Sequence, residues 1–148
     1  MSEQTPPAGC LGFLAIFGIK IDMDKIMPVD RLEAELYPVG TVGRTHEFAE
    51  VEYTSFRSGE RKMEIEVEDD AAIPPGEQAI ILVHGVEICR LTIGPESDTE
   101  VKLRSDKGDE VPPIKPGDLA QLMYQGHIIA QGEFIAEYLD GKPVPRKR

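Results

Sequence analysis

The sequence contains no Trp, two Cys and three His, and its aromatic content is 6%. Cys10 and Cys89 are too few for a disulfide framework, and neither has the Cys-x-x-Cys or Cys/His spacing that binds zinc. We therefore expect two ordinary thiols. His46, His84 and His127 are not spaced for a metal site or a catalytic triad.

Positive charge is also scarce. The chain has 16 Lys and Arg against 27 Asp and Glu, which gives a net charge of -11. Such a surface repels a phosphate backbone at long range, so nucleic acid is not an expected partner. The natural complement of this charge is a basic protein or a cation.

Long apolar runs are missing too. The most hydrophobic stretch, residues 11–23 (LGFLAIFGIKIDM), is shorter than the roughly 20 residues that cross a bilayer as a helix, so no transmembrane segment is expected. It alternates like a strand, which either joins its own sheet or is donated to another copy or partner; a helix or a membrane-surface contact is the remaining alternative. Phe13, Phe17 and Ile19 are core residues in the first case and contact residues in the second.

At 148 residues the chain fits one domain, expected over residues 11–140. Residues 1–10 are polar and Pro-containing, and we expect a disordered tail. They contain no positive charge and no apolar run, so no signal peptide is expected and the cytoplasm is the default location. Residues 141–148 form a basic tail.

An internal repeat organises the chain. Residues 75–93 (PGEQAIILVHGVEICRLTI) return as residues 116–134 (PGDLAQLMYQGHIIAQGEF). In each copy a Pro-Gly-acid opening precedes an apolar run, which His84-Gly85 or Gln125-Gly126 interrupts before a second run. This pattern predicts two β-hairpins with Gly85 and Gly126 at positive φ in the turns.

Superposing the two copies also predicts which side chains face the core, because a strand alternates faces. Ile88 and Ile129 are apolar in both copies at positions assigned to the outer side, which indicates that another layer covers them. His84 and His127 would approach each other if both hairpins turned at the same end. The predicted core positions are Ala79, Ile81, Val83, Cys89, Leu91 and Ile93, with Ala120, Leu122, Tyr124, Ala130, Gly132 and Phe134.

Three further runs alternate with period two, at residues 31–37, 47–54 and 62–68, and Val101 and Leu103 mark another strand. We also expect a bulge at Gly132 where the last strand continues. Together the signals predict an all-β fold, an antiparallel β-sandwich or partly open barrel of eight to nine short strands.

Acidic residues occupy the outer positions of the three alternating strands. If these strands form a consecutive meander, their glutamates gather on one face, either as a solvated surface or as a docking surface for a basic partner. Calcium is a further alternative, raised by the acidic loops at residues 106–110 and 69–70, which lack EF-hand spacing. The outer glutamates are Glu33, Glu35, Glu50, Glu52, Glu64, Glu66 and Glu68.

Four features occur over about residues 31–134: an alternating strand, the Pro-Gly-acid opening, the Gly hairpin, and a charged strand that leads to VKLRSDKGDEVPPIKPGD. In these features the chain resembles short all-β repeat modules of uncharacterised bacterial proteins. This resemblance implies an all-β fold and no assigned activity. Since no catalytic motif or cofactor motif occurs, we predict a non-enzymatic binding or structural module that acts through protein contacts, with another protein or as a homo-oligomer. The alternatives are a carboxylate-based hydrolase or sugar-active enzyme, and a Ca²⁺-binding β module.

Overall fold

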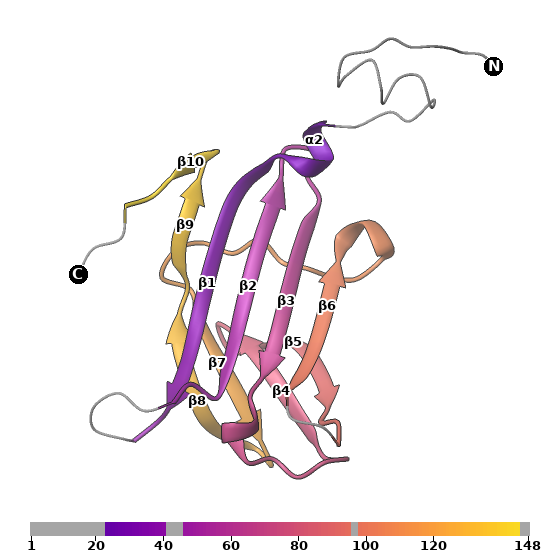
Figure 1. The fold of residues 1–148 in the computed structure, drawn as a ribbon, viewed down its shortest axis with the longest axis vertical. Coiled ribbons are helices and arrows are strands. Elements are labelled where there is room, and N and C mark those ends of the chain that lie inside the picture. Colours follow the sequence, from indigo (N-terminus) through magenta and orange to yellow (C-terminus); the bar gives the residue numbers. More distant parts are fainter. Residues whose placement is uncertain (1–22, 41–45, 96–97, 146–148) are drawn as a thin grey trace, which may run out of the picture.

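The computed structural model describes residues 23–40, 46–95 and 98–145. These residues form an antiparallel sheet that is nearly closed into a barrel (Figure 1), so the all-β prediction is confirmed in its barrel form. Phe13, Phe17 and Ile19 lie outside the described residues. The strands are β1 (Pro28–Pro38), β2 (Ala49–Phe56), β3 (Arg61–Val67), β4 (Gln78–Val83), β5 (Val86–Thr92), β6 (Thr99–Arg104), β7 (Leu119–Tyr124), β8 (His127–Glu133), β9 (Ile135–Leu139) and β10 (Lys142–Pro143).

The helical elements are short: the one-turn helix α2 (Met23–Ile26) and the 3-10 turns η1 (Asp69–Ala71) and η2 (Ser105–Lys107). No helix in the described part of the chain has the length and apolarity needed to cross a membrane. The strand order is β5-β4-β7-β8-β1-β2-β3-β6, while β9 pairs with β1 and β10 pairs with β9. We call β1, β2, β3 and β6 the front sheet and β5, β4, β7 and β8 the back sheet.

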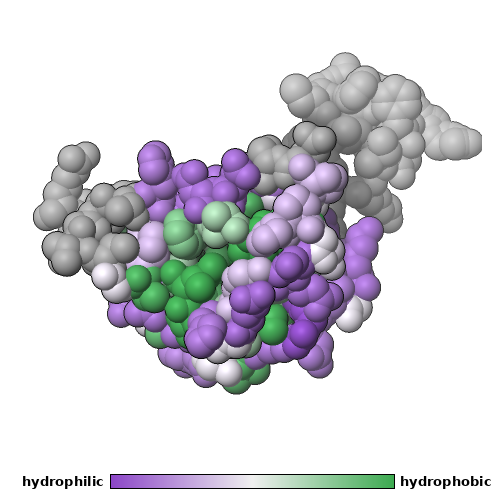
Figure 2. Space-filling model, turned by 90° about the horizontal axis from the view of Figure 1, so that it is seen from below, coloured by the Kyte–Doolittle hydropathy of each residue, from purple (hydrophilic) through white to green (hydrophobic). Residues whose placement is uncertain are grey.

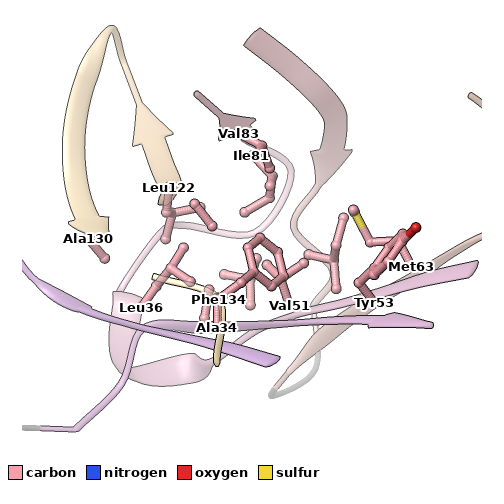
Figure 3. Packing of buried hydrophobic residues seen from close by; sticks show 14 of the residues in the cluster. Ala34, Leu36, Val51, Tyr53, Met63, Ile81, Val83, Leu122, Ala130 and Phe134 are labelled. Atoms are coloured by element: carbon pink, nitrogen blue, oxygen red, sulfur yellow. The ribbon is translucent and has the colours of Figure 1, made fainter. Parts of the chain in front are cut away.

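Alternation builds the core, as the sequence predicts. Leu36, Val51 and Ile65 from the front sheet are fully buried, and Ile81 and Leu122 from the back sheet are fully buried opposite them. Side chains from both sheets meet in one cluster (Figure 3). Each such side chain contributes about 1.5 to 3 kcal/mol when it leaves water, so this cluster is the main source of stability.

The two predicted hairpins are present with matching turns. His84 and Gly85 have φ values of 52° and 75°, and Gln125 and Gly126 have φ values of 53° and 79°. Both central residues of each two-residue loop are therefore left-handed, as a type I′ turn requires. Gly85 and Gly126 are the turn glycines that the sequence predicts.

The two hairpins are related by a local two-fold axis. β4 and β7 pair antiparallel, and Ile81 lies opposite Leu122, its own counterpart in the repeat. As a consequence the two turns point to opposite ends of the back sheet. The condition under which His84 and His127 would approach each other, both turns at the same end, is therefore not met.

The outward placement predicted for Ile88 and Ile129 is also wrong. Each hairpin has a register shift at this position: Glu87 lies opposite Leu82, whereas Cys89 lies opposite Ile81, so Ile88 is the extra residue of a bulge. The second hairpin is shifted in the same way at Ile129. Since a bulge interrupts the strict alternation, both isoleucines turn inward and pack against the core.

Gly132 is not the site of a bulge, contrary to the prediction. A Cβ built there would lie 2.0 Å from the carbonyl oxygen of Glu35. β1 pairs with β8 at Tyr37 and Pro38 but with β9 at Arg31 to Glu33. Gly132 therefore allows two backbones to approach closely where β1 changes partner.

The upper part of the front sheet is covered by the connection between β6 and β7, which crosses behind β3, β2 and β1 (Figure 1). Val111 and Ile114 from this connection belong to the core. The Arg61 Nε donates to the Val111 carbonyl and holds the connection in place. The inner face of the front sheet is thus buried over β1, β2 and β3 and partly buried at β6, while its outer face is open.

Candidate functional site

Glutamates line up across the outer face of the front sheet. In one row Glu35 pairs with Glu50, Glu50 with Glu66, and Glu66 with Glu100. In the neighbouring row Glu33 pairs with Glu52 and Glu52 with Glu64, and Lys102 ends that row. We call this surface the acidic face; it comprises Glu33, Glu35, Glu50, Glu52, Glu64, Glu66 and Glu100.

Three more carboxylates continue the acidic face at its lower end. Glu47 precedes β2, Glu68 follows β3 and Asp98 precedes β6, so the meander brings them together. The Glu68 backbone N–H donates to the Phe48 carbonyl at 2.8 Å, and the Asp69 N–H donates to Asp98 Oδ1 at 3.1 Å. These bonds hold the acids at fixed positions beside the glutamate row.

The upper end of the same outer face is basic. Arg31 lies opposite Thr54, Thr54 opposite Lys62, and Lys62 opposite Arg104. Lys62 Nζ lies 3.3 Å from Glu64 Oε2 and offsets part of the charge of that row. The front sheet therefore changes from positive at its upper end to strongly negative at its lower end. Seen from below, the molecule shows hydrophilic residues around a patch of hydrophobic ones (Figure 2).

The crowding of charge raises several pKa values. Burial and then Glu52 and Glu137 raise the pKa of Glu50. Burial raises the pKa of Glu66, and a hydrogen bond and charge repulsion from Asp98 add to the effect. Burial, Glu66 and Asp98 raise the pKa of Glu68 from its ordinary value of 4.5 to about 7. At neutral pH the lower end of the acidic face thus holds a carboxyl group that is about half protonated.

Glu47 also has a carboxyl group in an unfavourable environment. Its Oε1 atom is buried and has no hydrogen-bond partner among the residues that the structure describes. Burial, followed by repulsion from Glu35, raises the pKa of Glu47. A buried carboxylate oxygen without a donor is unfavourable, so a cationic group that reached this end of the face would be bound favourably.

Two carboxylate triplets could hold a divalent cation: Glu33, Glu35 and Glu50, and Glu66, Glu68 and Asp98, with one oxygen of each residue within 4.8 Å of the others. Such oxygens suit a hard cation such as Ca²⁺. The loop at residues 106–110, considered for calcium from the sequence, is instead occupied by internal contacts. Asp106 Oδ1 lies 3.0 Å from Arg104 Nε, and Asp109 Oδ2 accepts the Arg104 backbone N–H.

Two hollows beside the acidic face are smaller than most small-molecule sites. The hollow between Glu50, Glu52, Glu64, Glu66 and Glu100 measures about 60 Å³. A second hollow of about 290 Å³ is lined partly by Glu68. Small-molecule sites usually measure about 300 to 1,000 Å³ and bury most of their ligand. The acidic face is therefore more open than a typical small-molecule site.

Two of the three histidines pair with carboxylates. His84 Nε2 lies 2.7 Å from Asp118 Oδ1 and His46 Nδ1 lies 3.5 Å from Asp70 Oδ2. Burial would raise the pKa of Asp118, but the Lys115 backbone N–H and His84 outweigh it and lower the pKa.

The Cys89 thiol is half-buried. Burial, followed by Glu87 and Asp109, raises its pKa. A thiol of this kind stays protonated at neutral pH, which makes it a poor nucleophile.

No family model matches the chain, and no curated protein matches it.

The structure brings together the seven glutamates singled out from the sequence. It adds Glu47, Asp98 and Glu100, which the sequence analysis missed. Glu100 was detectable, because Val101 and Leu103 mark β6 and place Glu100 on the opposite face. Asp98 and Glu47 stand outside the strands, so only the tertiary structure places them at the acidic face.

Proposed function

We propose that the protein is a non-enzymatic binding module whose acidic face docks onto a basic surface of a protein partner. The observation that carries this proposal is the row of Glu35, Glu50, Glu66 and Glu100, which crosses all four strands of the front sheet without an intervening base. Like charges directly opposite each other on a sheet are destabilising, by roughly 0.2 to 1 kcal/mol for each pair. A partner that supplies Lys or Arg relieves this repulsion.

The shape of the face supports a protein partner. A flat sheet surface suits a broad interface, whereas a hydrolase that uses paired carboxylates needs a cleft around its substrate. Glu68, with its pKa of about 7, has the kind of shifted carboxyl group that such an enzyme uses. Burial and then the neighbouring acids raise this pKa, and a docking face with the same burial and the same acids shows it equally.

The basic upper row gives the interface a direction. Arg31, Lys62 and Arg104 stand on the same outer face as the glutamates. A partner with basic residues at one end of its surface and acidic residues at the other therefore fits in one orientation. Complementary charge of this kind accelerates association and suppresses wrong partners.

The test is calorimetric titration with an oligolysine peptide at low ionic strength. We expect the wild type to bind and the double variant E50Q/E66Q to bind about tenfold more weakly, which corresponds to about 1.4 kcal/mol. The matched control is E87Q/E110Q, which removes the same charge away from the acidic face and should bind within about twofold of the wild type. Equal losses in both variants would show that only net charge matters, and would refute the proposal.

Calcium is the competing occupant of the face, since the two carboxylate triplets suit it. Titration with CaCl₂ distinguishes the two. The proposal predicts no saturable calcium binding at concentrations below about 1 mM, the weak end of the range for protein calcium sites. Tight calcium binding that E50Q/E66Q abolishes would assign the face to the cation instead.

A further inference from the structure

Among the described strands, the barrel is left open between β5 and β6. These strands end the order β5-β4-β7-β8-β1-β2-β3-β6, and in the described part of the chain β5 pairs only with β4 and β6 only with β3. A strand at the edge of a sheet presents unpaired N–H and C=O groups that can accept another strand.

The free edge of β6 is capped by the chain itself. At its upper end the Arg104 N–H donates to Asp109 Oδ2 and the Arg104 carbonyl accepts the Asp109 N–H. At its lower end the Gly94 N–H donates to Thr99 Oγ1, which ties the preceding loop to the strand without occupying a backbone group of β6. Its outer side chains are Glu100, Lys102 and Arg104, and charges of this kind discourage edge pairing.

The free edge of β5 has no such caps among the described residues. The two-residue turn makes Val83 and Val86 a hydrogen-bonded pair, so the ladder leaves the N–H and C=O groups of Glu87, Arg90 and Thr92 directed away from β4. Val86 is 61% exposed at the start of this strand. β5 is therefore the open edge of the barrel.

A hollow of about 460 Å³ lies beside the start of β5. Its apolar lining comes from Val86 and Ile88 on one side and from Val111 and Pro112 on the other. Its polar lining is mostly acidic, formed by Glu87, Asp109 and Glu110 together with Arg61. A strand that paired with β5 would direct alternate side chains into this hollow, so the edge selects a segment with alternating apolar residues and a positive charge.

Residues 11–21 of the chain, LGFLAIFGIKI, match the apolar requirement. In an extended strand Phe13, Phe17 and Ile19 share one face, and the single charged residue, Lys20, lies on the other. The seven residues of β5 extend about 23 Å at about 3.3 Å per residue, which eleven residues in strand form cover. We propose that β5 accepts residues 11–21 of a second copy of this chain as an added strand.

The position of α2 favours a second copy, and not the same chain, as the source of the strand added to β5. Met27, just after α2, accepts the Arg57 N–H with its carbonyl, which fixes the start of the described chain beside the β2–β3 turn. This point lies at the upper end of the front sheet, whereas β5 lies in the lower half of the molecule (Figure 1). Only Asp22 separates Ile21 from Met23, so the connection within one chain is short. A second copy has no such constraint.

The core supports an accessory role for the donated segment. Leu32, Leu36, Ile65, Ile81 and Leu122 are fully buried by described residues alone. Residues 11–21 are therefore not needed to complete the barrel core. This inference concerns β5 and is independent of the acidic face.

The test compares R90P with R90A in the full chain by sedimentation velocity across a concentration series. R90P removes an N–H that points away from β4, so it blocks strand addition while the ladder to β4 remains. R90A removes the same side chain and keeps the N–H. We expect the wild type and R90A to self-associate with dissociation constants within about threefold of each other, and R90P and F13E/F17E to associate at least tenfold more weakly. Circular dichroism establishes that all four proteins are folded.

Three outcomes would overturn the proposal. Equal association of R90P and R90A would show that β5 is not the docking edge. A monomeric wild type whose Arg90 amide is protected from hydrogen exchange would show that residues 11–21 of the same chain occupy the edge. A monomeric wild type with an unprotected Arg90 amide would leave the edge to a different protein.

Discussion

Replacing Glu68 by Gln is expected to stabilise the protein at and above neutral pH. Burial, Glu66 and Asp98 raise the pKa of Glu68 to about 7 from an ordinary value of 4.5. A carboxyl group with a raised pKa binds its proton more tightly in the folded state. It therefore contributes stability below pH 4.5, and that contribution is lost as the pH rises toward 7.

The magnitude follows from the size of this shift. Each tenfold change in acidity is worth about 1.4 kcal/mol, so the change from 4.5 to about 7 sets a ceiling of about 3 kcal/mol. Glu68 is only partly buried, and solvent screening reduces the effect to about 1 to 2 kcal/mol. Gln has nearly the same shape and no charge, so E68Q should recover this free energy at pH 8 and leave stability unchanged at pH 4.

Urea unfolding at pH 4, 6, 7 and 8 measures the difference directly. The gain of E68Q over the wild type should appear between pH 4.5 and 7 and then stay constant. E110Q is the control, because Glu110 is exposed and stands away from the acidic face. A gain that is independent of pH, or a loss of stability at pH 8, would refute this account and indicate that the Glu68 carboxylate has a favourable partner.

Three further predictions concern single residues. G85V and G126V should each lower the free energy of unfolding by about 1 to 3 kcal/mol in thermal melts. The φ values of 75° and 79° disfavour a β-branched residue, although no atom lies within 4 Å of the added Cβ. Unchanged stability would contradict the turn assignment. G132A should cost at least about 2 kcal/mol, since its Cβ would lie 2.0 Å from the Glu35 carbonyl oxygen, and an equally stable variant would mean that β1 and β8 do not approach so closely. E66Q should stabilise the protein by some tenths of a kcal/mol at low salt and less at 0.5 M NaCl, because salt screens repulsion; a loss of several kcal/mol would show that Glu66 is a paired carboxylate.

The sequence was sufficient to predict the strands of the front sheet and both hairpins, because period-two alternation and turn glycines are local signals. It also placed Glu33, Glu35, Glu50, Glu52 and Glu64 on a common face. That inference needed only consecutive antiparallel pairing, which short connections favour. Glu66 and Glu68 followed from the same argument.

Features that depend on contacts between distant segments were not accessible in this way. The bulge that turns Ile88 and Ile129 inward leaves the apolar pattern nearly unchanged, so superposing the repeats gave the wrong face. Gly132 resembled a bulge residue, but its role depends on the backbone of β1, which lies far away in sequence. The opposite directions of the two turns follow from the antiparallel pairing of β4 and β7, which the repeat alone does not determine.

The most direct test of the proposed docking face is an NMR titration of the ¹⁵N-labelled protein with an oligolysine peptide. The account predicts saturable shifts that are largest for the amides of Glu50, Glu66 and Glu68 and that disappear at 0.5 M NaCl. Amides of the back sheet should remain unchanged. Shifts that are largest on β4 and β7, or that are spread evenly over all surface acids, would contradict a docking function of the acidic face.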